Sequence, residues 1–342
     1  MKVLHIHFGK EGGAERFFVN LANAFGERGV EQHFIIRPGR TWEGLIEKLG
    51  PIWLNNYRNL SLSSFLLEWR VKRLIRTWQP DAVMAWMPRA SRLIPNMDGP
   101  VKLTRLGDYP VHLRNFKNPD VLVGNQPSIA THSQDLGWDK PIRTISNFAR
   151  QVTPVPVSRG ALDTPEDAFV ISSAGRFVNR KGMDFLIRAA ARVPNAYLWL
   201  IGEGKERDAL EALAQSEGIA DRTRFIGWVD EPIHYIAASD VFGMTSRHEP
   251  LGNVVLEAWQ AKVPVVATRP EGPSWYMVDG DNGVLTDIDD LDPFVAGLQK
   301  IKDDPVFGAK MVEGGSAQLD TRFSKRGIVD QYLDLLENGP KN

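Results

Sequence analysis

Strand-like and helical patterns alternate along the whole chain, and this alternation restricts the fold more than any other sequence feature. In the first half, three short apolar runs are separated by two helical patterns, at residues 3–8, 14–25, 32–37, 65–78 and 82–86. The second half repeats the alternation at residues 169–174, 183–192, 197–202, 206–217, 223–226, 241–245, 252–261 and 263–267. Strands that alternate with helices form parallel sheets with crossover helices. The sequence therefore predicts an α/β protein with two doubly wound units.

The length of 342 residues also fits two domains of ordinary size. Residues 151–165 contain three prolines and follow neither the strand nor the helix period, so they predict a linker. We expect a first domain at 1–150, a second domain at 166–320 and a final segment at 321–342. In that segment Ile328, Tyr332, Leu335 and Leu336 recur at helical spacing, which predicts a helix with one buried face.

The composition excludes several kinds of chemistry and suggests a compartment. The chain contains no cysteine, which removes disulfides, thiolate metal sites, iron–sulfur clusters and a cysteine nucleophile. No basic region followed by an apolar stretch opens the sequence, and no apolar run approaches the roughly 20 residues of a membrane-spanning helix. We therefore expect a cytoplasmic protein.

The two halves of the chain carry opposite charge. Residues 1–150 contain 21 Lys and Arg against 13 Asp and Glu, whereas residues 151–342 contain 20 against 29. A basic half on a globular protein suggests an anionic partner, either nucleic acid, a phospholipid surface or a phosphorylated substrate. Composition alone does not choose among these three.

Residues 249–257 form the most informative segment, because they follow an apolar run and pass into a helical pattern. A glycine permits close backbone approach, and amides at a helix start bind a diphosphate. The amides in question belong to Gly252, Asn253 and Val254. Glu257 lies one turn beyond Asn253, where it can accept hydrogen bonds from two ribose hydroxyls, while Glu249 faces whatever lies beyond the phosphates. The alternative is an ordinary strand–loop–helix turn with a solvated Glu257.

Residues 175–182 follow another apolar run and contain Arg176 and Lys181. Ligands bind at the carboxyl ends of strands in open α/β sheets, so two cations there suit a diphosphate whose negative charge grows as it leaves. The alternative is a solvated basic loop. In the first half, Gly12 and Gly13 open the helical pattern at 14–25 and can approach a phosphate or a sugar closely, although they do not form a G-x-G-x-x-G dinucleotide motif.

Taken in order, these segments resemble the retaining glycosyltransferases of family 4, which have the GT-B fold and use nucleotide-sugar donors. The resemblance is strong across residues 169–290 and weaker in the first half, where it rests on residues 12–15 and 145–147. The segments that carry it in the second half are 175–176, 181–182, 200–204, 225–227, 246–249, 252, 256–258, 264–267 and 281–283.

The resemblance implies a fold and roles for these residues. The fold would be two Rossmann-like domains that face a cleft, an acceptor-binding first domain and a donor-binding second domain, with the last helix crossing back to the first. Glu249 would contact the donor sugar, and Glu257 would hold the ribose. Arg176 and Lys181 would hold the diphosphate with help from the amides after Leu251, and the loop ending at Val229 would meet the base.

One segment departs from the family pattern. Many relatives carry a histidine at the end of a first-domain strand, near the reacting carbon, and Asp108 stands in the corresponding stretch here, with His112 close by. Some relatives in bacterial surface-polysaccharide or lipopolysaccharide synthesis resemble this chain at the Gly-Asp-Tyr loop and at residues 123–125. This likeness favours a role in building the cell envelope.

Other candidate residues have simpler interpretations. His5 and His7 alternate along the first strand and are interpreted as core residues rather than metal ligands. Residues 287–289 resemble a D-x-D metal motif, but a solvated acidic turn is favoured. In the helix at 65–78, a stripe of Leu67, Val71, Leu74 and Trp78 stands beside the basic residues Arg70, Lys72, Arg73 and Arg76. That pattern suits an anionic membrane surface, or a packed crossover helix with a solvated basic face.

The leading hypothesis is a metal-independent, retaining hexosyltransferase with no cofactor and no nucleic-acid partner. It would move a sugar from a nucleoside-diphosphate donor, with UDP favoured, to a hydroxyl of an envelope glycan or a lipid-linked acceptor. The place of action would be the cytoplasm or the inner face of the cytoplasmic membrane. The alternatives are a nucleotide-sugar epimerase or phosphorylase of the same fold, and a catalytically silent subunit that binds the donor.

Overall fold

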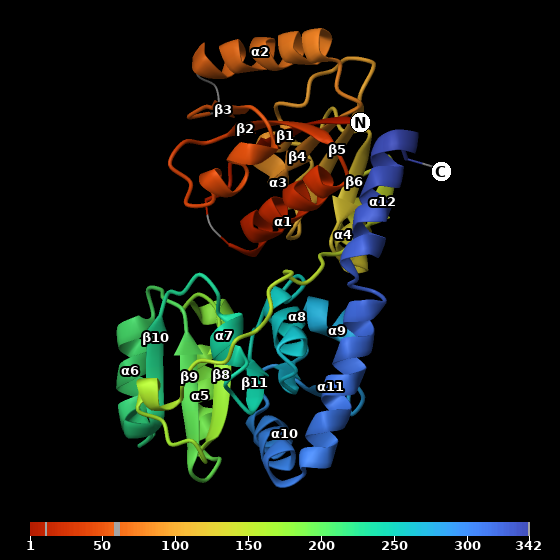
Figure 1. Cartoon of the computed structure of the whole chain (residues 1–342). Helices are drawn as coiled ribbons and strands as arrows, with labels where there is room; N and C mark the ends of the chain where they lie inside the picture. The colour runs from red at the N-terminus through yellow and green to blue at the C-terminus, as the bar shows by residue number, and fades with distance from the viewer. Residues whose placement is uncertain (11, 58–61, 341–342) are drawn as a thin grey trace. The chain divides into compact units, whose positions relative to one another are not determined.

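The computed structural model describes residues 1–10, 12–57 and 62–340, which divide into two compact units. Unit 1 consists of Met1–Phe148 with Lys325–Asn342, and unit 2 consists of Ala149–Ser324. Each unit contains one parallel sheet with helices on both faces, as Figure 1 shows. The prediction of two doubly wound α/β units is thereby confirmed.

The sheet of unit 1 has the strand order β3-β2-β1-β4-β5-β6-β7, and every recorded pairing in it is parallel. Its strands are β1 (Lys2–His7), β2 (Glu31–Ile36), β3 (Ile52–Leu54), β4 (Ala82–Trp86), β5 (Val101–Leu106), β6 (Val121–Gly124) and β7 (Ile142–Thr144). Its helices are α1 (Gly13–Glu27), η1 (Glu43–Leu45), η2 (Glu47–Leu49), α2 (Leu62–Trp78), α3 (Met87–Ser91), α4 (Pro127–Asp135) and α12 (Lys325–Asn338).

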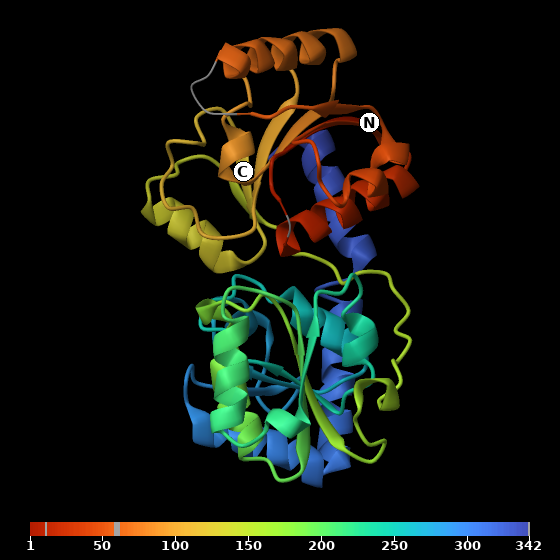
Figure 2. The same ribbon diagram turned by 90° about the vertical axis from the view of Figure 1, so that its left-hand side faces the viewer.

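Alternate residues of the strands in unit 1 point to opposite faces of the sheet and build two separate cores. Val3 packs with α1 and α12 on one face, whereas Leu4 packs with α2 on the other. Figures 1 and 2 show α2 and α1 on opposite faces of the sheet. Both faces are apolar, because parallel strands covered by helices on both sides have no solvated face.

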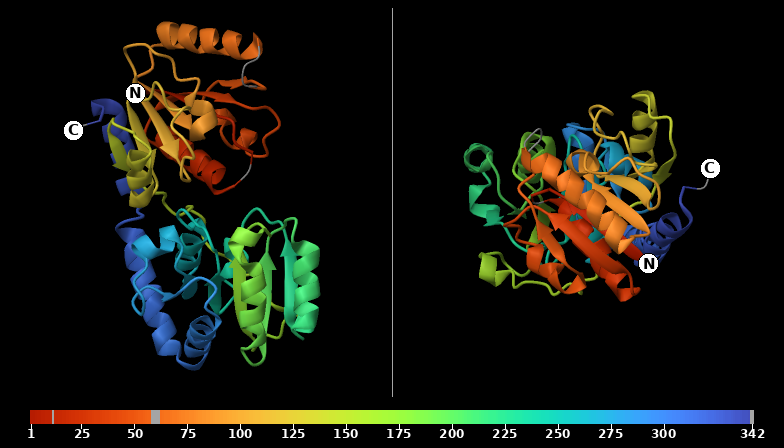
Figure 3. Two further views of the ribbon diagram at one scale, coloured as in Figure 1. Left: turned by 180° about the vertical axis from the view of Figure 1, so that it is seen from behind. Right: turned by 90° about the horizontal axis from the view of Figure 1, so that it is seen from above.

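Helix α12 belongs to unit 1 although it lies at the other end of the chain. The side chains Ile328, Tyr332, Leu335 and Leu336 are buried together with Phe17 of α1 and with residues of β5 and β6. Figures 1 and 3 show α12 running beside these strands. The apolar spacing in residues 327–337 thus has its buried partner in the first half of the chain.

The sheet of unit 2 has the strand order β10-β9-β8-β11-β12-β13, again with parallel pairings. Its strands are β8 (Phe169–Ala174), β9 (Ala196–Ile201), β10 (Thr223–Gly227), β11 (Val241–Met244), β12 (Val265–Thr268) and β13 (Val284–Thr286). Its helices are η3 (Gly160–Leu162), η4 (Asn179–Lys181), α5 (Met183–Ala191), α6 (Arg207–Ser216), η5 (Ala220–Arg222), α7 (Ile233–Ile236), α8 (Asn253–Gln260), α9 (Glu271–Tyr276), α10 (Leu291–Asp303) and α11 (Pro305–Asp320).

Residues 151–158, the first part of the predicted linker, contain no helix or strand, and they are bound to the surface of unit 2. The amides of Val155 and Val157 donate to the ring Nδ1 and the carbonyl of His234, at 3.0 and 3.2 Å. Val152 accepts a hydrogen bond of 2.8 Å from Gln260. The prolines therefore lie in a segment without helix or strand that is hydrogen-bonded to unit 2.

No helix within the described ranges combines the length and the apolar character that crossing a bilayer requires.

Candidate active site

The sheet order of unit 2 reverses between β8 and β11, which are neighbours in the sheet but far apart in the chain. At such a point the loops after the two strands diverge to opposite sides, and ligands of open α/β sheets bind there. The loop after β8 carries Arg176 and Lys181, and the loop after β11 carries Glu249 and Gly252. The topology thus brings together the two segments that the sequence singled out.

Lys181 and Glu249 form an ion pair between Nζ and Oε2, and their side chains are only 16% and 13% exposed. Ser246 Oγ donates to the same carboxylate oxygen at 3.2 Å. An ion pair largely removed from water is screened less than a surface pair, so this contact holds the two loops together. Arg176 lies in the same loop as Lys181, but its side chain is exposed.

Gly182 allows the close approach of these two loops. Its φ of 64° lies in the left-handed region, and a Cβ there would stand 2.0 Å from the carbonyl oxygen of Thr245. Thr245 Oγ1 in turn donates to the carbonyl of Lys181 at 3.1 Å. A side chain at this position would therefore separate the loop of Lys181 from the loop of Glu249.

Arg247 connects the same loops through its guanidinium group. It makes two hydrogen bonds of 2.9 Å to the carboxylate of Asp184 and two of 3.0 Å to Asp289, and it donates to the carbonyl of Asn179 at 2.8 Å. Burial alone would raise the pKa of Asp184, but the hydrogen bonds and charge of Arg247 lower it overall. Asp289, interpreted from sequence as part of a solvated acidic turn, is thus a structural partner of Arg247.

Helix α8 begins directly after Gly252, whose φ of 88° is again left-handed. The amides of its first turn lie before the first carbonyl of the helix that could accept from them. This end of a helix therefore attracts anions. These amides belong to Asn253 and Val254, next to the buried Leu251. The phenol of Tyr276 donates to the carbonyl of Gly252 at 3.4 Å, and burial together with the charge of Glu249 raises its pKa.

Glu257 lies on α8 one turn beyond Asn253, and it is only 6% exposed. The alternative of a solvated Glu257 is therefore wrong. Glu257 is thus a buried carboxylate close to the edge of the sheet at which ligands of open α/β proteins bind. Val229, predicted to meet the base, lies half-buried after β10, which is two strands away from β8 in the sheet.

Sequence reasoning missed Glu271, whose carboxylate contacts both His248 and Glu249. One carboxylate oxygen of Glu271 pairs with His248 Nδ1 at 2.9 Å, and the other accepts from the amide of Glu249 at 3.2 Å. Burial opposes ionisation of Glu271, but hydrogen bonds from its own amide and from His248 lower its pKa overall. The one local feature of the sequence that could have drawn attention to Glu271 is the glycine that follows it. In the structure a Cβ at Gly272 would lie 2.5 Å from the backbone of Leu251, so this position requires glycine.

The other predicted residues lie in unit 1. Gly12 precedes α1 with a φ of 151°, and Gly13 begins that helix after β1. Asp108 is half-buried after β5, and its carboxylate accepts from the amide of Tyr109 at 2.8 Å. His5 and His7 are fully buried beside aromatic rings, which confirms the interpretation that they are core residues.

Known proteins resemble this chain along nearly its whole length. The profile described as "Glycosyl transferases group 1" matches residues 155–318. The lipopolysaccharide core biosynthesis glycosyltransferase LpsE of Rhizobium meliloti (strain 1021) is 52% identical over 340 residues, which cover 99% of this chain and 100% of LpsE. The chain belongs to the group 1 glycosyltransferases. The related LpsD of the same organism is 48% identical over 99% of each chain.

Solved structures show that this glycosyltransferase has the GT-B fold. HepE of Anabaena, crystallised with UDP and glucose, superposes with a TM-score of 0.84 at 21% identity, covering 99% of this chain and 100% of that one. Sucrose-phosphate synthase from Thermosynechococcus elongatus superposes with a TM-score of 0.85 at 18% identity over 98% of each chain. The predicted GT-B fold, with its two Rossmann-like domains, is confirmed.

Proposed function

We propose that this glycosyltransferase moves a sugar from a UDP-sugar to a hydroxyl of the lipopolysaccharide core or a similar envelope glycan, on the cytoplasmic side of the membrane. LpsE and LpsD, which match along nearly their whole length, support the acceptor class by their names. UDP is supported by the crystallised complex of the fold neighbour HepE. The observation that carries the proposal is the pairing of Lys181 with Glu249 beside the start of α8.

In the proposed donor complex, the start of α8 binds the diphosphate through the amides of Gly252, Asn253 and Val254. Arg176 and Lys181 supply positive charge, and the carboxylate of Glu257 accepts hydrogen bonds from the ribose hydroxyls. Val229 lies against the base. The exposed Arg176 is available to the phosphates, whereas Lys181 shares its charge between Glu249 and the diphosphate.

Glu249 then faces the donor sugar. Two anions close together repel each other, so a carboxylate beside a diphosphate needs a cation between them. Lys181 fills this role before the donor binds and holds Glu249 in place. As the bond from sugar to phosphate breaks, negative charge grows on the diphosphate and positive charge grows on the sugar. Lys181 stabilises the first charge and Glu249 the second.

We further propose that the reaction retains the configuration at the anomeric carbon and proceeds without a metal. Arg176, Lys181 and the helix start would take over the role that a divalent cation has on a leaving diphosphate. Gly12 and Gly13 are assigned to binding of the nucleotide-sugar, and Asp108 is assigned to the catalytic residues. Activity should survive EDTA, and full inactivation by the chelator that Mg²⁺ or Mn²⁺ reverses would contradict the metal-free mechanism.

A stability screen against UDP-, GDP- and ADP-sugars tests the donor class. A ligand at 100 times its Kd stabilises a protein by about 2.7 kcal/mol, and we expect this effect from a UDP-sugar. Stabilisation by a GDP- or ADP-sugar alone would replace UDP as the donor base. Slow hydrolysis of the selected donor, with the released sugar analysed by NMR, separates an enzyme from a silent binding subunit and reports the anomeric configuration.

A further inference from the structure

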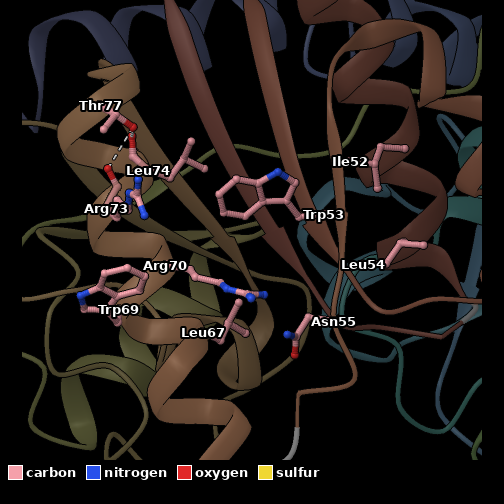
Figure 4. A pocket seen from close by; sticks show the side chains of 10 residues that line it. All are labelled: Ile52, Trp53, Leu54, Asn55, Leu67, Trp69, Arg70, Arg73, Leu74 and Thr77. Atoms are coloured by element: carbon pink, nitrogen blue, oxygen red, sulfur yellow. Dashed lines mark hydrogen bonds between the residues drawn. The ribbon is translucent and has the colours of Figure 1, made fainter.

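Two features of the structure take no part in the proposed binding of the donor. A pocket of about 700 Å³ lies between β3 and α2 of unit 1, and Figure 4 shows Trp53 and Leu74 among the side chains that line it. Its lining mixes tryptophan, leucine and arginine side chains and does not single out one occupant. The second feature lies in unit 2, beside the proposed active site. It is the segment from the end of β12 to the start of α9, which contacts the loop of Glu249.

This segment contacts the loop after β11 at successive points. Thr268, the last residue of β12, donates from its hydroxyl to the carbonyl of Ser246 at 2.8 Å. The amide of Gly272 donates to the carbonyl of Glu249 at 2.9 Å. A Cβ at Gly272 would lie 2.5 Å from the backbone of Leu251, so the absence of a side chain lets α9 begin directly against the loop.

The start of α9 binds the backbone of Glu249 on both sides of its Cα. The amide of Glu249 donates to Glu271 Oε2 at 3.2 Å, and its carbonyl accepts from Gly272. The backbone of one residue has only two soft dihedral angles, and fixing the amide and the carbonyl restricts both. The direction in which the Glu249 side chain leaves the loop therefore depends on α9. Lys181 and Ser246 bind the carboxylate at the far end of that side chain.

His248 in turn holds Glu271. The ring Nδ1 of His248 lies 2.9 Å from Glu271 Oε1, so one oxygen of this carboxylate contacts His248 and the other contacts the amide of Glu249. The side chains of His248 and Glu271 are 34% and 38% exposed, and a pair so open to water adds little to stability. We therefore expect Glu271 to affect the orientation of Glu249 more than the free energy of unfolding.

We propose that Glu271 is a positioning residue for glycosyl transfer, which fixes the backbone of Glu249 so that the Glu249 carboxylate faces the donor sugar. This inference rests on the role proposed for Glu249 and adds a residue that acts through it. A carboxylate that stabilises a developing charge is effective only when it is already in place. His248 contributes by holding the carboxylate of Glu271 against the Glu249 amide.

Steady-state kinetics of the full chain and titration with UDP, or with the nucleoside diphosphate that the stability screen selects, test the proposal together. Glu271→Ala should lower kcat by about 10²-fold, the effect of a displacement of about 1 Å at the reacting groups. The nucleotide should bind within about threefold of wild type, because Glu257 and the start of α8 keep their contacts. Glu271→Gln keeps an oxygen that accepts from the Glu249 amide and should restore most of kcat.

Asp240→Ala is the matched control for a purely structural role. Asp240 also accepts from a backbone amide, that of Val170 at 2.7 Å, and pairs with Arg159 at 3.0 Å. Its side chain is 36% exposed, but it lies at the amino end of β11, at the opposite edge of the sheet. Asp240→Ala should keep kcat within about threefold of wild type. Loss of kcat in this control equal to that in Glu271→Ala would overturn the proposal.

The double variant Glu249→Gln with Glu271→Ala tests whether Glu271 acts through Glu249. It should be no slower than Glu249→Gln alone, since a residue that only positions Glu249 has nothing left to position. Additive losses of kcat, unchanged kcat in Glu271→Ala, or a fall in nucleotide affinity as large as the fall in kcat would each overturn the proposal.

Hydrogen exchange of residues 246–252 provides a readout that does not require turnover. Exchange should be faster in Glu271→Ala than in wild type and unchanged in Asp240→Ala, because the amide of Glu249 loses its acceptor only in the first variant. Unchanged exchange in Glu271→Ala would show that Glu271 does not fix the loop. Failure of the wild type to bind or turn over any sugar nucleotide would instead contradict the proposed function, and the exchange result would still report on Glu271.

Discussion

Two histidines of β1 are held neutral in the core of unit 1. Burial lowers the pKa of both His5 and His7 to about 3, and neighbouring positive charges contribute to the shift at His7. His5 shares a hydrogen bond of 3.1 Å with Gln32, and His7 lies 3.7 Å from the carboxylate of Glu15. With its pKa so low, the contact of His7 is that of a neutral ring with a carboxylate.

Because these histidines are neutral when folded, we expect the free energy of unfolding to fall in mild acid. In the unfolded chain their pKa returns to about 6.5, so between about 6.5 and 3 the unfolded state binds protons that the folded state does not. The free energy of unfolding should therefore be greatest above pH 6.5 and fall by up to about 1.4 kcal/mol per pH unit and per histidine below it. Urea unfolding at about pH 7.5 and about pH 5 measures this, above the range in which carboxylates titrate.

His7→Gln provides the comparison for this acid sensitivity. The substituted protein lacks one titrating group, so its free energy of unfolding should fall less between the two pH values than that of the wild type. The same fall in both proteins would mean that His7 is protonated in the folded state as well.

At the scale of single residues, the sequence pointed to candidate site residues but not to the residues that hold them in place. Glycines, cations and carboxylates at strand ends pointed to Lys181, Glu249 and Glu257, because their residue types and spacing suit a nucleotide. Arg247 and Glu271 were missed as supports, since their roles depend on partners 63 and 22 residues away in the chain. A local pattern cannot show such contacts.

In unit 2, hydrogen bonds of Arg247 join the loop after β8 to the loop after β11. Arg247 hydrogen bonds to Asn179 of the first loop and to Asp184 at the start of α5, and its backbone amide donates to the carbonyl of Arg180 at 2.8 Å. Lys181 and Glu249 lie in the same two loops and form an ion pair with each other. We infer that Arg247 is a positioning residue, which holds these two residues in register without touching the donor.

Arg247→Ala should lower kcat/KM by about 10²-fold, the effect expected when catalytic groups shift by about 1 Å. Arg247→Lys should recover little of this loss, because an ammonium group cannot make the paired bonds to Asp184 and Asp289 together. Steady-state kinetics with the donor selected by the stability screen provides the measurement. Arg192→Ala, which removes the exposed pair with Asp292, is the matched control and should be near wild type. Wild-type activity of Arg247→Ala would refute the positioning role.

The strands and helices that the sequence predicted have clear apolar periods, whereas the longer helices α10 and α11 were missed. Short elements such as β3 and β7, of three residues each, were missed since they are too short to establish a period. Helix α2 shows a second reason why prediction fails. Its apolar stripe was recognised from the sequence, but what the stripe packs against was not. Whether Leu67 and Val71 meet a core or a membrane depends on the sheet beneath them.

At the scale of the whole molecule, both ends of the chain build unit 1. Leu336 of α12 is 1% exposed and packs in the same core as Phe17 and Phe25 of α1. Lys325 and Arg28 add ion pairs to Glu27 and Asp330 across the two helices, but exposed pairs of this kind contribute little. Apolar burial therefore attaches the end of the chain to its beginning.

Leu336→Ala should lower the free energy of unfolding of unit 1 by about 2 to 5 kcal/mol, the usual cost of a leucine-sized cavity. Urea unfolding followed by tryptophan fluorescence measures it. Glu337→Ala, at the next and exposed position of the same helix, should change stability by less than about 0.5 kcal/mol. Equal stability of the two variants would show that α12 contributes no packing energy to unit 1.

We infer that the edge of unit 2 around Glu257 binds a nucleoside diphosphate. Calorimetric titration with UDP, or with the nucleoside diphosphate that the stability screen selects, measures it directly for the wild type, Glu257→Gln and Glu249→Gln. We predict that Glu257→Gln weakens binding by about tenfold or more, because the ribose hydroxyls lose a charged acceptor. Glu249→Gln should bind within about threefold of wild type and lose turnover instead. Unchanged affinity in Glu257→Gln would contradict the binding of the ribose by Glu257.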